Sequence, residues 1–390
     1  MRKATMLHND VIEKNLIKDV YIATALITTY AKCGMLEKAR ELFDQLSTRD
    51  VVTWNAIIAG YVQHGLGHEA LDCFRKMQHL SVSPSSVTYM CILKACGIVG
   101  RLDIGEGIDA EIREKELLQE DAVLGTALVD MYSKCGALEK AQKVFENLPT
   151  RDVVAWSALI SGYAQHGHGA NALECFQQMQ ETGVRPNAVT YICILKACGI
   201  VGSLHIGENI DIEVRKQGLL HKHVVLGAAL VDMYSKCGML EKAQEVFDQL
   251  PVRNVGSWNA LIAGYAQNGF GDEALRCLKQ MQDVGVQPDP VTYICILKAC
   301  GSVGSLQIGE DIDAEVRKQG LLQKDVVLGT ALVDMYAKCG ALEKARDVFE
   351  NLQVRNVVTW NALITGYVHH GCGHEALKCF KHMRDLGIGP

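Results

Sequence analysis

The 390-residue sequence lacks any uninterrupted apolar run of the roughly 18 to 20 residues that a membrane-spanning helix needs. Its first residues, MRKATMLHND, contain no apolar segment that resembles a secretory signal. The sequence also lacks an excess of basic residues: its formal net charge is −6, whereas phosphate binding usually leaves a basic footprint. These absences argue against a membrane protein and mildly against a nucleic-acid partner, although net charge does not say how charge divides between two faces of a protein.

The residue clusters that would support enzyme chemistry are also missing. No C-x-x-C pair occurs, and the fragments GLG and GEG do not follow a strand as a phosphate-binding loop would. Two histidine pairs have the four-residue spacing of some zinc sites, but each pair straddles a glycine turn: His64 with His68, and His370 with His374. The equivalent positions of other copies hold Asn268 and Asp272, or Ala170 for the second histidine. We therefore expect no metal site, no cofactor and no enzyme activity.

Cysteine, by contrast, is frequent, and its fifteen copies recur at fixed places in a repeated sequence. One series is Cys33, Cys135, Cys237 and Cys339; another is Cys73, Cys175, Cys277 and Cys379; further copies are Cys91, Cys193 and Cys295 with Cys96, Cys198 and Cys300, and Cys372 stands alone. Cysteine repeated at one helical position is more simply a small buried hydrophobic residue than a disulfide partner. We expect reduced thiols.

The repetition itself is the main feature of the sequence. The stretch TWNAIIAGYVQHGLGHEALDCF, which begins at Thr53, returns in altered form three times, and its tryptophans Trp54, Trp156, Trp258 and Trp360 are 102 residues apart. Each period contains three related pieces, which in the first full copy begin at residues 51, 86 and 122. A chain built from such copies buries its apolar surface between neighbours rather than around one centre.

Each piece has the apolar spacing of two amphipathic helices. Trp54, Ile57, Ile58 and Tyr61 follow one helical face, and after a glycine turn the pattern resumes at Ala70, Leu71, Phe74 and Met77. Other pieces break at Gly100 and Gly136, and the prolines Pro84, Pro186 and Pro288 lie near the ends of the first type of piece. We expect an all-α fold, a right-handed α-solenoid superhelix of helix-turn-helix repeats, whose first helices line one surface.

The pattern V-T-W-N-A-L-I-x-G-Y, a glycine turn, E-A-L-x-C-F-x-x-M and a final G-V-x-P-D/N resembles the pentatricopeptide repeat. The middle piece with T-Y-I-C-I-L-K-A-C-G and the short piece with A-L-V-D-M-Y-x-K-C-G are similar to the L and S repeats of the PLS subclass of plant organelle proteins. On this resemblance residues 1–390 form a single array. Its repeats are 1–19 (partial L), 20–50 (S), 51–85 (P), 86–121 (L), 122–152 (S), 153–187 (P), 188–223 (L), 224–254 (S), 255–289 (P), 290–325 (L), 326–356 (S) and 357–390 (P, truncated). The chain looks like a segment of a longer array, and its uncapped ends predict some self-association.

The resemblance implies sequence-specific binding of single-stranded RNA, one base per repeat, with the protein N-terminus toward the RNA 5′ end. It implies the targeting array of an organelle factor for C-to-U RNA editing or RNA processing, in a mitochondrion or chloroplast, with accessory editing proteins as further partners. A zinc deaminase needs an H-x-E and a P-C-x-x-C motif. The sequence has neither, so the chain itself is not expected to perform editing.

The family recognises each base with the fifth and the last residue of a repeat, and two such side chains can reach the edge of an unstacked base. By this analogy Thr24 with Asp50 recognises G, Asn55 with Ser85 C, Thr126 with Asp152 G, Ser157 with Asn187 A, Asn259 with Asp289 U, and Thr330 with Asn356 A, while Asn361 implies a pyrimidine. Ala228 offers no hydrogen bond beside Asn254, so that base stays open. The L repeats present apolar fifth residues and are expected to space rather than recognise: Met90 with Asp121, Ile192 with His223, and Ile294 with Asp325.

Two further sets of residues complete the expected interface. Contacts to the base rings are expected from the second residues Tyr21, Val52, Val123, Val154, Val225, Val327 and Val358, with Gly256 as a departure. Candidate phosphate contacts are Lys32, Lys134, Lys236 and Lys338 in the S repeats and Lys94, Lys196 and Lys298 in the L repeats.

Each set of residues also has an explanation that does not involve RNA. Threonine or asparagine near a helix start is often a cap, and an exposed lysine is often only solvated. The coordinated variation of fifth and last residues within a fixed frame favours base recognition over capping. The alternative for the whole chain is a protein-binding scaffold of the tetratricopeptide kind, which shares the hairpin geometry and would suit the negative charge.

Overall fold

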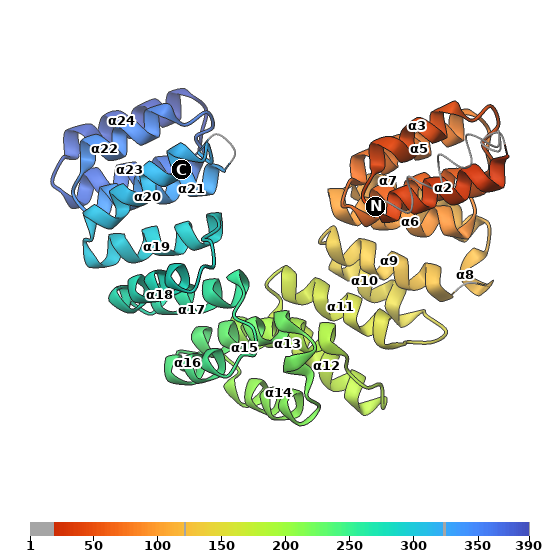
Figure 1. Cartoon of the computed structure of the whole chain (residues 1–390), viewed down its shortest axis with the longest axis horizontal. Helices are drawn as coiled ribbons and strands as arrows, with labels where there is room; N and C mark the ends of the chain where they lie inside the picture. The colour runs from red at the N-terminus through yellow and green to blue at the C-terminus, as the bar shows by residue number, and fades with distance from the viewer. Residues whose placement is uncertain (1–18, 121, 323–324, 390) are drawn as a thin grey trace. The chain divides into compact units, whose positions relative to one another are not determined.

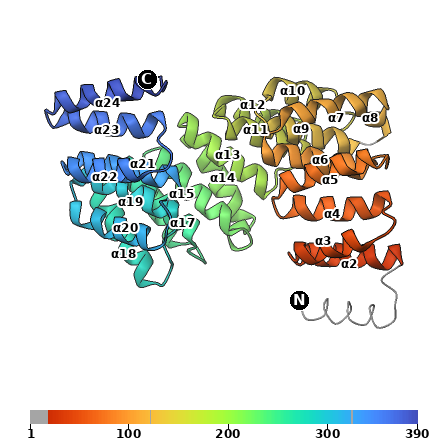
Figure 2. The same cartoon turned by 90° about the horizontal axis from the view of Figure 1, so that it is seen from above.

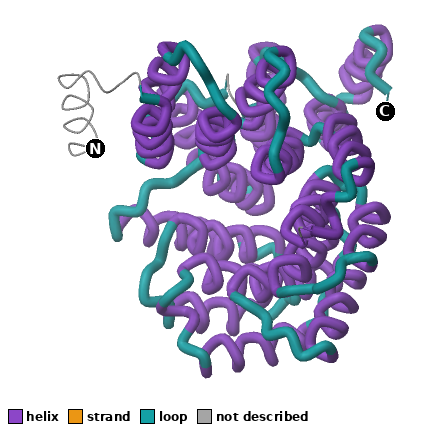
Figure 3. Tube along the Cα trace, turned by 90° about the vertical axis from the view of Figure 1, so that its right-hand side faces the viewer, coloured by secondary structure: helices purple, strands orange, loops and turns teal. Residues whose placement is uncertain are grey.

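The computed structural model describes residues 19–120, 122–322 and 325–389, and this part of the chain contains helices and connecting loops but no strand (Figure 1, Figure 3). The partial repeat at residues 1–18 lies outside the described residues. The chain divides into two compact units, residues 1–197 and 198–390. None of the described helices is long and apolar enough to span a membrane. Each unit is a stack of helical hairpins, which confirms the expected all-α solenoid of hairpins.

Each hairpin has a first and a second helix. The first helices are α2 (Val20–Lys32), α4 (Val51–Gln63), α6 (Ser86–Val99), α9 (Ala122–Lys134), α11 (Val153–Gln165), α13 (Ala188–Val201), α15 (Val224–Lys236), α17 (Val255–Gln267), α19 (Pro290–Val303), α21 (Val326–Lys338) and α23 (Val357–His369). The second helices are α3 (Leu36–Gln45), α5 (Gly67–His79), α7 (Leu102–Glu114), α10 (Leu138–Glu146), α12 (Gly169–Glu181), α14 (Leu204–Lys216), α16 (Leu240–Asp248), α18 (Gly271–Asp283), α20 (Leu306–Lys318), α22 (Leu342–Asn351) and α24 (Gly373–Asp385). Short turns α8 (Leu117–Glu120) and η2 (Leu219–His221) connect L to S repeats.

At most of the described junctions the last residue of a repeat caps the first helix of the next. The Asp50 carboxylate accepts from the backbone N–H of Thr53 at 2.8 Å, and Asn254 accepts from Ser257 at 2.9 Å. Such a cap satisfies a backbone donor that has no partner inside the helix. The last residues that are expected to contact bases therefore also have a structural role as helix caps.

First helices pack on first helices, so their N-terminal halves form a row within each unit. In unit 1, α2 packs against α4, and α4 against α6 (Figure 2); in unit 2, α15, α17, α19, α21 and α23 continue the same way. The close approach explains a glycine of the repeated frame, because a Cβ on Gly60 would lie 2.6 Å from the Cβ of Ala31 on the preceding first helix. No larger residue fits there without moving a helix.

Aromatic packing joins each S repeat to the following P repeat. Trp54 is 1% exposed and meets the ring of Phe43 edge-on, with centroids 4.7 Å apart. The same pair recurs as Phe145 with Trp156, Phe247 with Trp258, and Phe349 with Trp360. The tryptophan of the TWN motif is thus a core residue, and the residue that follows it is held in a fixed place.

A buried polar cluster joins each L repeat to the following S repeat. In unit 2 the carboxylate of Asp211 accepts from Tyr234 Oη at 2.9 Å and from Arg215 Nε at 2.6 Å. The cluster recurs around Asp109 and Asp313. Burial raises the pKa of Tyr234 above its ordinary value. Because every member is hydrogen-bonded, the cluster fixes the register of the hairpins without leaving a buried charge unpaired.

Candidate nucleic-acid interface

The fifth residues lie on the first helices where two successive repeats meet. Asn55, Thr24 and Thr330 are half-buried there, while Ser157 and Asn259 are 7% and 9% exposed. Asn361, on the last described first helix, is exposed. Apart from Asn361, these side chains are therefore not on an open surface.

In two P repeats the fifth residue contacts the last residue directly. Asn259 donates from Nδ2 to Oδ1 of Asp289 at 2.9 Å, and Asn55 donates from Nδ2 to Oγ of Ser85 at 3.0 Å. These residues are 30 positions apart, so the stacking of repeats brings them together. Base recognition needs this convergence of two side chains on one place.

In other repeats a hydroxyl of the next first helix connects the pair. Thr24 Oγ1 lies 2.9 Å from Thr53 Oγ1, which in turn donates to Oδ1 of Asp50 at 2.7 Å. Thr330, Thr359 and Asn356 form the same chain, with distances of 2.8 and 2.9 Å. Ser157 lies 2.8 Å from Thr190, which donates to Asn187 at 3.1 Å.

The hydrogen bonds also set the charge of one last residue. The side-chain hydroxyl and the backbone N–H of Thr53 hold the pKa of Asp50 below its ordinary value. Asp50 is exposed, so its carboxylate is available as an acceptor at neutral pH. An ionised acceptor suits the N1–H and N2–H donors of guanine.

The remaining junctions lack this connection. Asp152 caps α11 through the backbone N–H groups of Val154 and Ala155, and Ala155 has no hydroxyl to link it to Thr126. Ala228 offers no polar atom, and the side chain of Asn254 caps α17.

The L repeats place apolar side chains at the same point. Met90, Ile192 and Ile294 are half-buried, and the residues at the position of the hydroxyl in the S repeats after Met90 and Ile294, Leu124 and Leu328, are fully buried. His223 makes no side-chain cap, Asp325 caps α21, and Asp121 lies outside the described residues. An apolar junction cannot distinguish base edges by hydrogen bonding.

Within each unit the second residues form an exposed apolar row beside the fifth residues. Val52 and Val358 are 58% and 57% exposed, and Tyr21 is 85% exposed. The others of the expected set are also exposed: Val123, Val154, Val225 and Val327. Solvent-exposed valine at the same helical place in successive repeats offers an apolar surface to a flat ring.

Sequence reasoning missed the L-repeat members of this row. Val87, Val189 and Val291 are 47%, 55% and 52% exposed at the second residue of their repeats. The signal was present, because V-T-Y at the L-repeat start has the same spacing as V-T-W. The L repeats therefore expose an apolar side chain at the same position as the P and S repeats.

The lysine candidates divide into two groups. Lys134, Lys236 and Lys338 each donate to an aspartate one turn earlier at 2.7 Å: Asp130, Asp232 and Asp334. Lys32 has Thr28, and not an aspartate, one turn earlier. The lysines of the L repeats, Lys94, Lys196 and Lys298, are exposed and make no ion pair among the described residues. The paired lysines present less net charge than their number suggests.

The first histidine of each pair, His64 and His370, has a structural role. His64 Nε2 lies 2.7 Å from the carbonyl oxygen of Ala31, and Asn268 donates to the equivalent carbonyl of Ser235 at 3.0 Å. Among the described residues no group of three or more His, Cys, Asp or Glu could hold a metal ion. All fifteen thiols are free; Cys33 is exposed, whereas Cys198 is fully buried. Burial raises the pKa of Cys198 to about 12.

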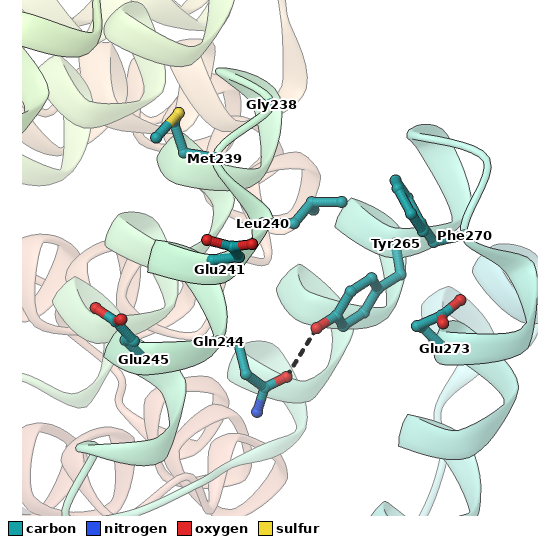
Figure 4. A pocket seen from close by; sticks show the side chains of 9 residues that line it. All are labelled: Gly238, Met239, Leu240, Glu241, Gln244, Glu245, Tyr265, Phe270 and Glu273. Atoms are coloured by element: carbon teal, nitrogen blue, oxygen red, sulfur yellow. Dashed lines mark hydrogen bonds between the residues drawn. The ribbon is translucent and has the colours of Figure 1, made fainter.

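A cavity of ≈ 700 Å³ in unit 2 lies apart from the fifth residues (Figure 4). It is bounded by α16 and by the C-terminal end of α17 and the start of α18, and Tyr265 donates to Gln244 inside it at 3.0 Å. Three carboxylates line it: Glu241, Glu245 and Glu273. An RNA backbone would be repelled there, so this cavity does not belong to the candidate interface.

Comparison with known proteins places the repeats in a family. The PPR repeat family model matches residues 49–97, 151–199 and 253–302, and the PPR repeat model matches 21–51, 126–153, 229–255, 330–357 and 358–388. A chloroplastic pentatricopeptide repeat-containing protein of Arabidopsis thaliana is 36% identical over 97% of this chain and 61% of its own length. A mitochondrial one is 36% identical over 99% of this chain and 37% of its own length. The chain thus spans about half the length of the curated relatives it matches.

A solved structure agrees with the fold. The pentatricopeptide repeat protein PPR10 in complex with an 18-nt psaJ RNA element has a TM-score of 0.69 and 20% sequence identity, over 97% of this chain and 57% of that chain. PPR10 from maize gives a TM-score of 0.63 over 95% of this chain and 59% of that chain. The chain belongs to the pentatricopeptide repeat family and is an array of helical repeats.

Proposed function

We propose that this chain binds single-stranded RNA in a sequence-specific manner, with one base at each repeat. The fifth and last residues of P and S repeats contact the edge of a base, and the second residues contact its ring. The observation that carries this proposal is the convergence of Asn259 and Asp289, 30 residues apart, on a single hydrogen bond of 2.9 Å.

The remaining bonding capacity of such a pair suits a base. The Asn259 amide has a second N–H beyond the one it gives to Asp289, and it can donate to a uracil carbonyl. The carboxylate has a second oxygen that can accept from uracil N3–H. The free-energy cost of unstacking a base is small because single-stranded RNA already exposes its base edges.

The expected target is 5′-G-C-N-G-A-N-N-U-N-A-Y-3′, with the protein N-terminus at the 5′ end. We place the chain as the targeting array of an RNA-editing (C-to-U) or RNA-processing factor. The relatives named chloroplastic or mitochondrial favour one of these two organelles, and accessory editing proteins are further candidate partners. The relative PPR10, solved in complex with RNA, favours an RNA partner over a protein-binding scaffold.

An electrophoretic shift assay tests the proposal. RNA of the target order should bind more tightly than RNA of equal composition whose specified bases are scrambled, while a change at an unspecified N should have little effect. Equal binding of both RNAs would refute sequence recognition by these residues.

A further inference from the structure

The third residue of the following repeat lies between the fifth and the last residue. It carries a hydroxyl in all three described P-to-L junctions and in some S-to-P junctions. The threonines concerned are all fully buried: Thr53, Thr88, Thr190, Thr292 and Thr359. A buried hydroxyl needs partners, and here its partners are the proposed base-contacting side chains.

At the P-to-L junction the threonine contacts both the fifth and the last residue. Thr292 Oγ1 accepts from the backbone N–H of Asp289 at 3.1 Å, and its one proton faces Oδ1 of Asn259 at 2.6 Å and Oδ1 of Asp289 at 3.0 Å. The Nδ2 of Asn259 is then directed to the carboxylate of Asp289. A reversed amide would bring Oδ1 of Asn259 against the carboxylate oxygen, so two acceptors would face each other.

The same arrangement occurs in unit 1. Thr88 Oγ1 accepts from the backbone N–H of Ser85 at 2.9 Å and donates to Oδ1 of Asn55 at 2.7 Å. The Nδ2 of Asn55 again lies against the last residue. Both units thus have the same arrangement, in which the threonine hydroxyl lies between the fifth and the last residue.

At the S-to-P junctions the chain provides its own comparison. Thr24 with Asp50 and Thr126 with Asp152 are the same residue pair, but the third residue between them is Thr53 in one case and Ala155 in the other. Of these two junctions, only the first has a third residue with a hydroxyl, and Thr53 Oγ1 is hydrogen-bonded to both Thr24 and Asp50. At a third junction Ser257 has a hydroxyl, but it donates to the backbone oxygen of Asn254 at 2.8 Å.

We propose that the third residue of the following repeat is a positioning residue for base recognition, because its hydroxyl holds the fifth and last side chains in one hydrogen-bonding arrangement. Repeats followed by threonine discriminate among bases more sharply than repeats followed by alanine. This inference rests on the proposed function, because the base is the ligand of the pair.

The test measures discrimination at single bases with the full chain. The Kd ratio for A over G is determined at the first base, contacted by Thr24 and Asp50, and at the fourth base, contacted by Thr126 and Asp152. Thr53→Ala should lower the ratio at the first base about fivefold, as expected for one hydrogen bond, and leave the fourth unchanged. Ala155→Thr should raise the ratio at the fourth base by a similar factor.

Conservative variants separate positioning from folding. Thr53→Ser keeps the hydroxyl and should retain the ratio, whereas Thr53→Val keeps the shape and should lose it. Thr292→Ser and Thr292→Val give the same comparison for U over A at the eighth base. A purely structural role would instead lower the Tm and weaken all RNAs equally.

The outcomes of this test are distinct. If Thr53→Val and Thr292→Val weaken all RNAs by one factor with unchanged ratios, the positioning role is wrong and the proposed function stands. If the unmodified chain shows no discrimination at any of these bases, the proposed function fails and the inference fails with it.

Discussion

The Asn259 amide donates to the Asp289 carboxylate across two successive repeats, at 2.9 Å. This hydrogen bond is made within the fold, so the packing of the two repeats holds the side chains together. Holding them costs entropy during folding rather than during binding, which favours tight and selective association. The donor and acceptor of this pair are the basis of the uracil assignment.

Exchange of this pair should change the base that is preferred. Asn259→Thr with Asp289→Asn places at the eighth position the same threonine and asparagine pair that the S repeat at 326–356 carries. The preference at the eighth base should then move from U toward A. Discrimination of about 1 to 3 kcal/mol per base is typical of such contacts. Competition binding with four RNAs that differ only at this base measures the change; an unaltered order of preference would refute the assignment.

Stability should respond to one residue that departs from the repeated pattern. Ser81 has φ +57°, while the equivalent residues of the other P repeats are Gly183, Gly285 and Gly387, at φ +73° to +77°. A side chain in this left-handed conformation costs about 1 kcal/mol. Ser81→Gly should therefore stabilise the chain by about that amount.

The reverse substitution is its matched control. A Cβ on Gly183 would meet nothing within 4 Å, so Gly183→Ser tests backbone strain without a clash. It should destabilise by about 1 kcal/mol in denaturant unfolding. A stabilising Gly183→Ser or a neutral Ser81→Gly would show that the turn is not strained.

The helical hairpins could be predicted because their signals are local. Glycine turns such as Gly136, at φ +77°, and caps such as Asp50 stand beside the helices they end or begin. The apolar period of three to four residues also identifies the buried face, as Trp54 shows. Repetition made the pattern clear, since each signal occurs several times.

The candidate site was harder to predict, because its geometry depends on packing between repeats. Thr53 belongs to the repeated V-T-W frame, and only stacking brings it to Thr24, 29 residues earlier. A residue expected to contact a base can also cap a helix, as Asp50 does. From the sequence alone these two roles looked like alternatives, although one side chain can combine them. The pairing of Lys134 with Asp130 was visible in the sequence as a one-turn spacing, and it was overlooked.

Release of one paired lysine should strengthen RNA binding. Lys236 donates to Asp232 at 2.7 Å, and Asp232→Asn removes the neighbouring charge while keeping a polar side chain. If Lys236 then contacts a phosphate, the slope of log Kd against log salt should steepen by up to about 0.7. The affinity at low salt should rise a few-fold.

Glu241→Gln is the matched control for this charge change. It removes one negative charge from the cavity at α16, away from the fifth residues. The account expects a smaller effect on affinity and an unchanged salt slope. Equal effects of Asp232→Asn and Glu241→Gln would mean that only net charge matters and that Lys236 is not a phosphate contact.

The thiols should differ widely in reactivity. Cys33 is exposed, while Cys198 is fully buried and its pKa is raised to about 12 by burial. Iodoacetamide at mildly alkaline pH should modify Cys33 first and leave Cys198 unmodified until the chain unfolds, as mass spectrometry of peptides would show. Rapid modification of Cys198 in the folded chain would contradict the packing described.

The same thiol predicts a direction for alkaline stability. Its folded pKa of about 12 lies above the ordinary value of 9.0, so the neutral buried form contributes stability below pH 9.0. That contribution is lost as pH rises from 9.0 toward 12. Cys198→Ala should flatten the alkaline decline in denaturant midpoint relative to the unmodified chain, and an identical decline would refute this contribution.

Selection from a randomised RNA pool tests the central claim most directly. The chain is incubated with the pool, the bound fraction is sequenced, and base frequencies are aligned. The account predicts enrichment of 5′-G-C-N-G-A-N-N-U-N-A-Y-3′, with the least information at the L-repeat positions and at the position of Ala228. A bound fraction with the base composition of the starting pool, or with its information concentrated at the L-repeat positions, would contradict it.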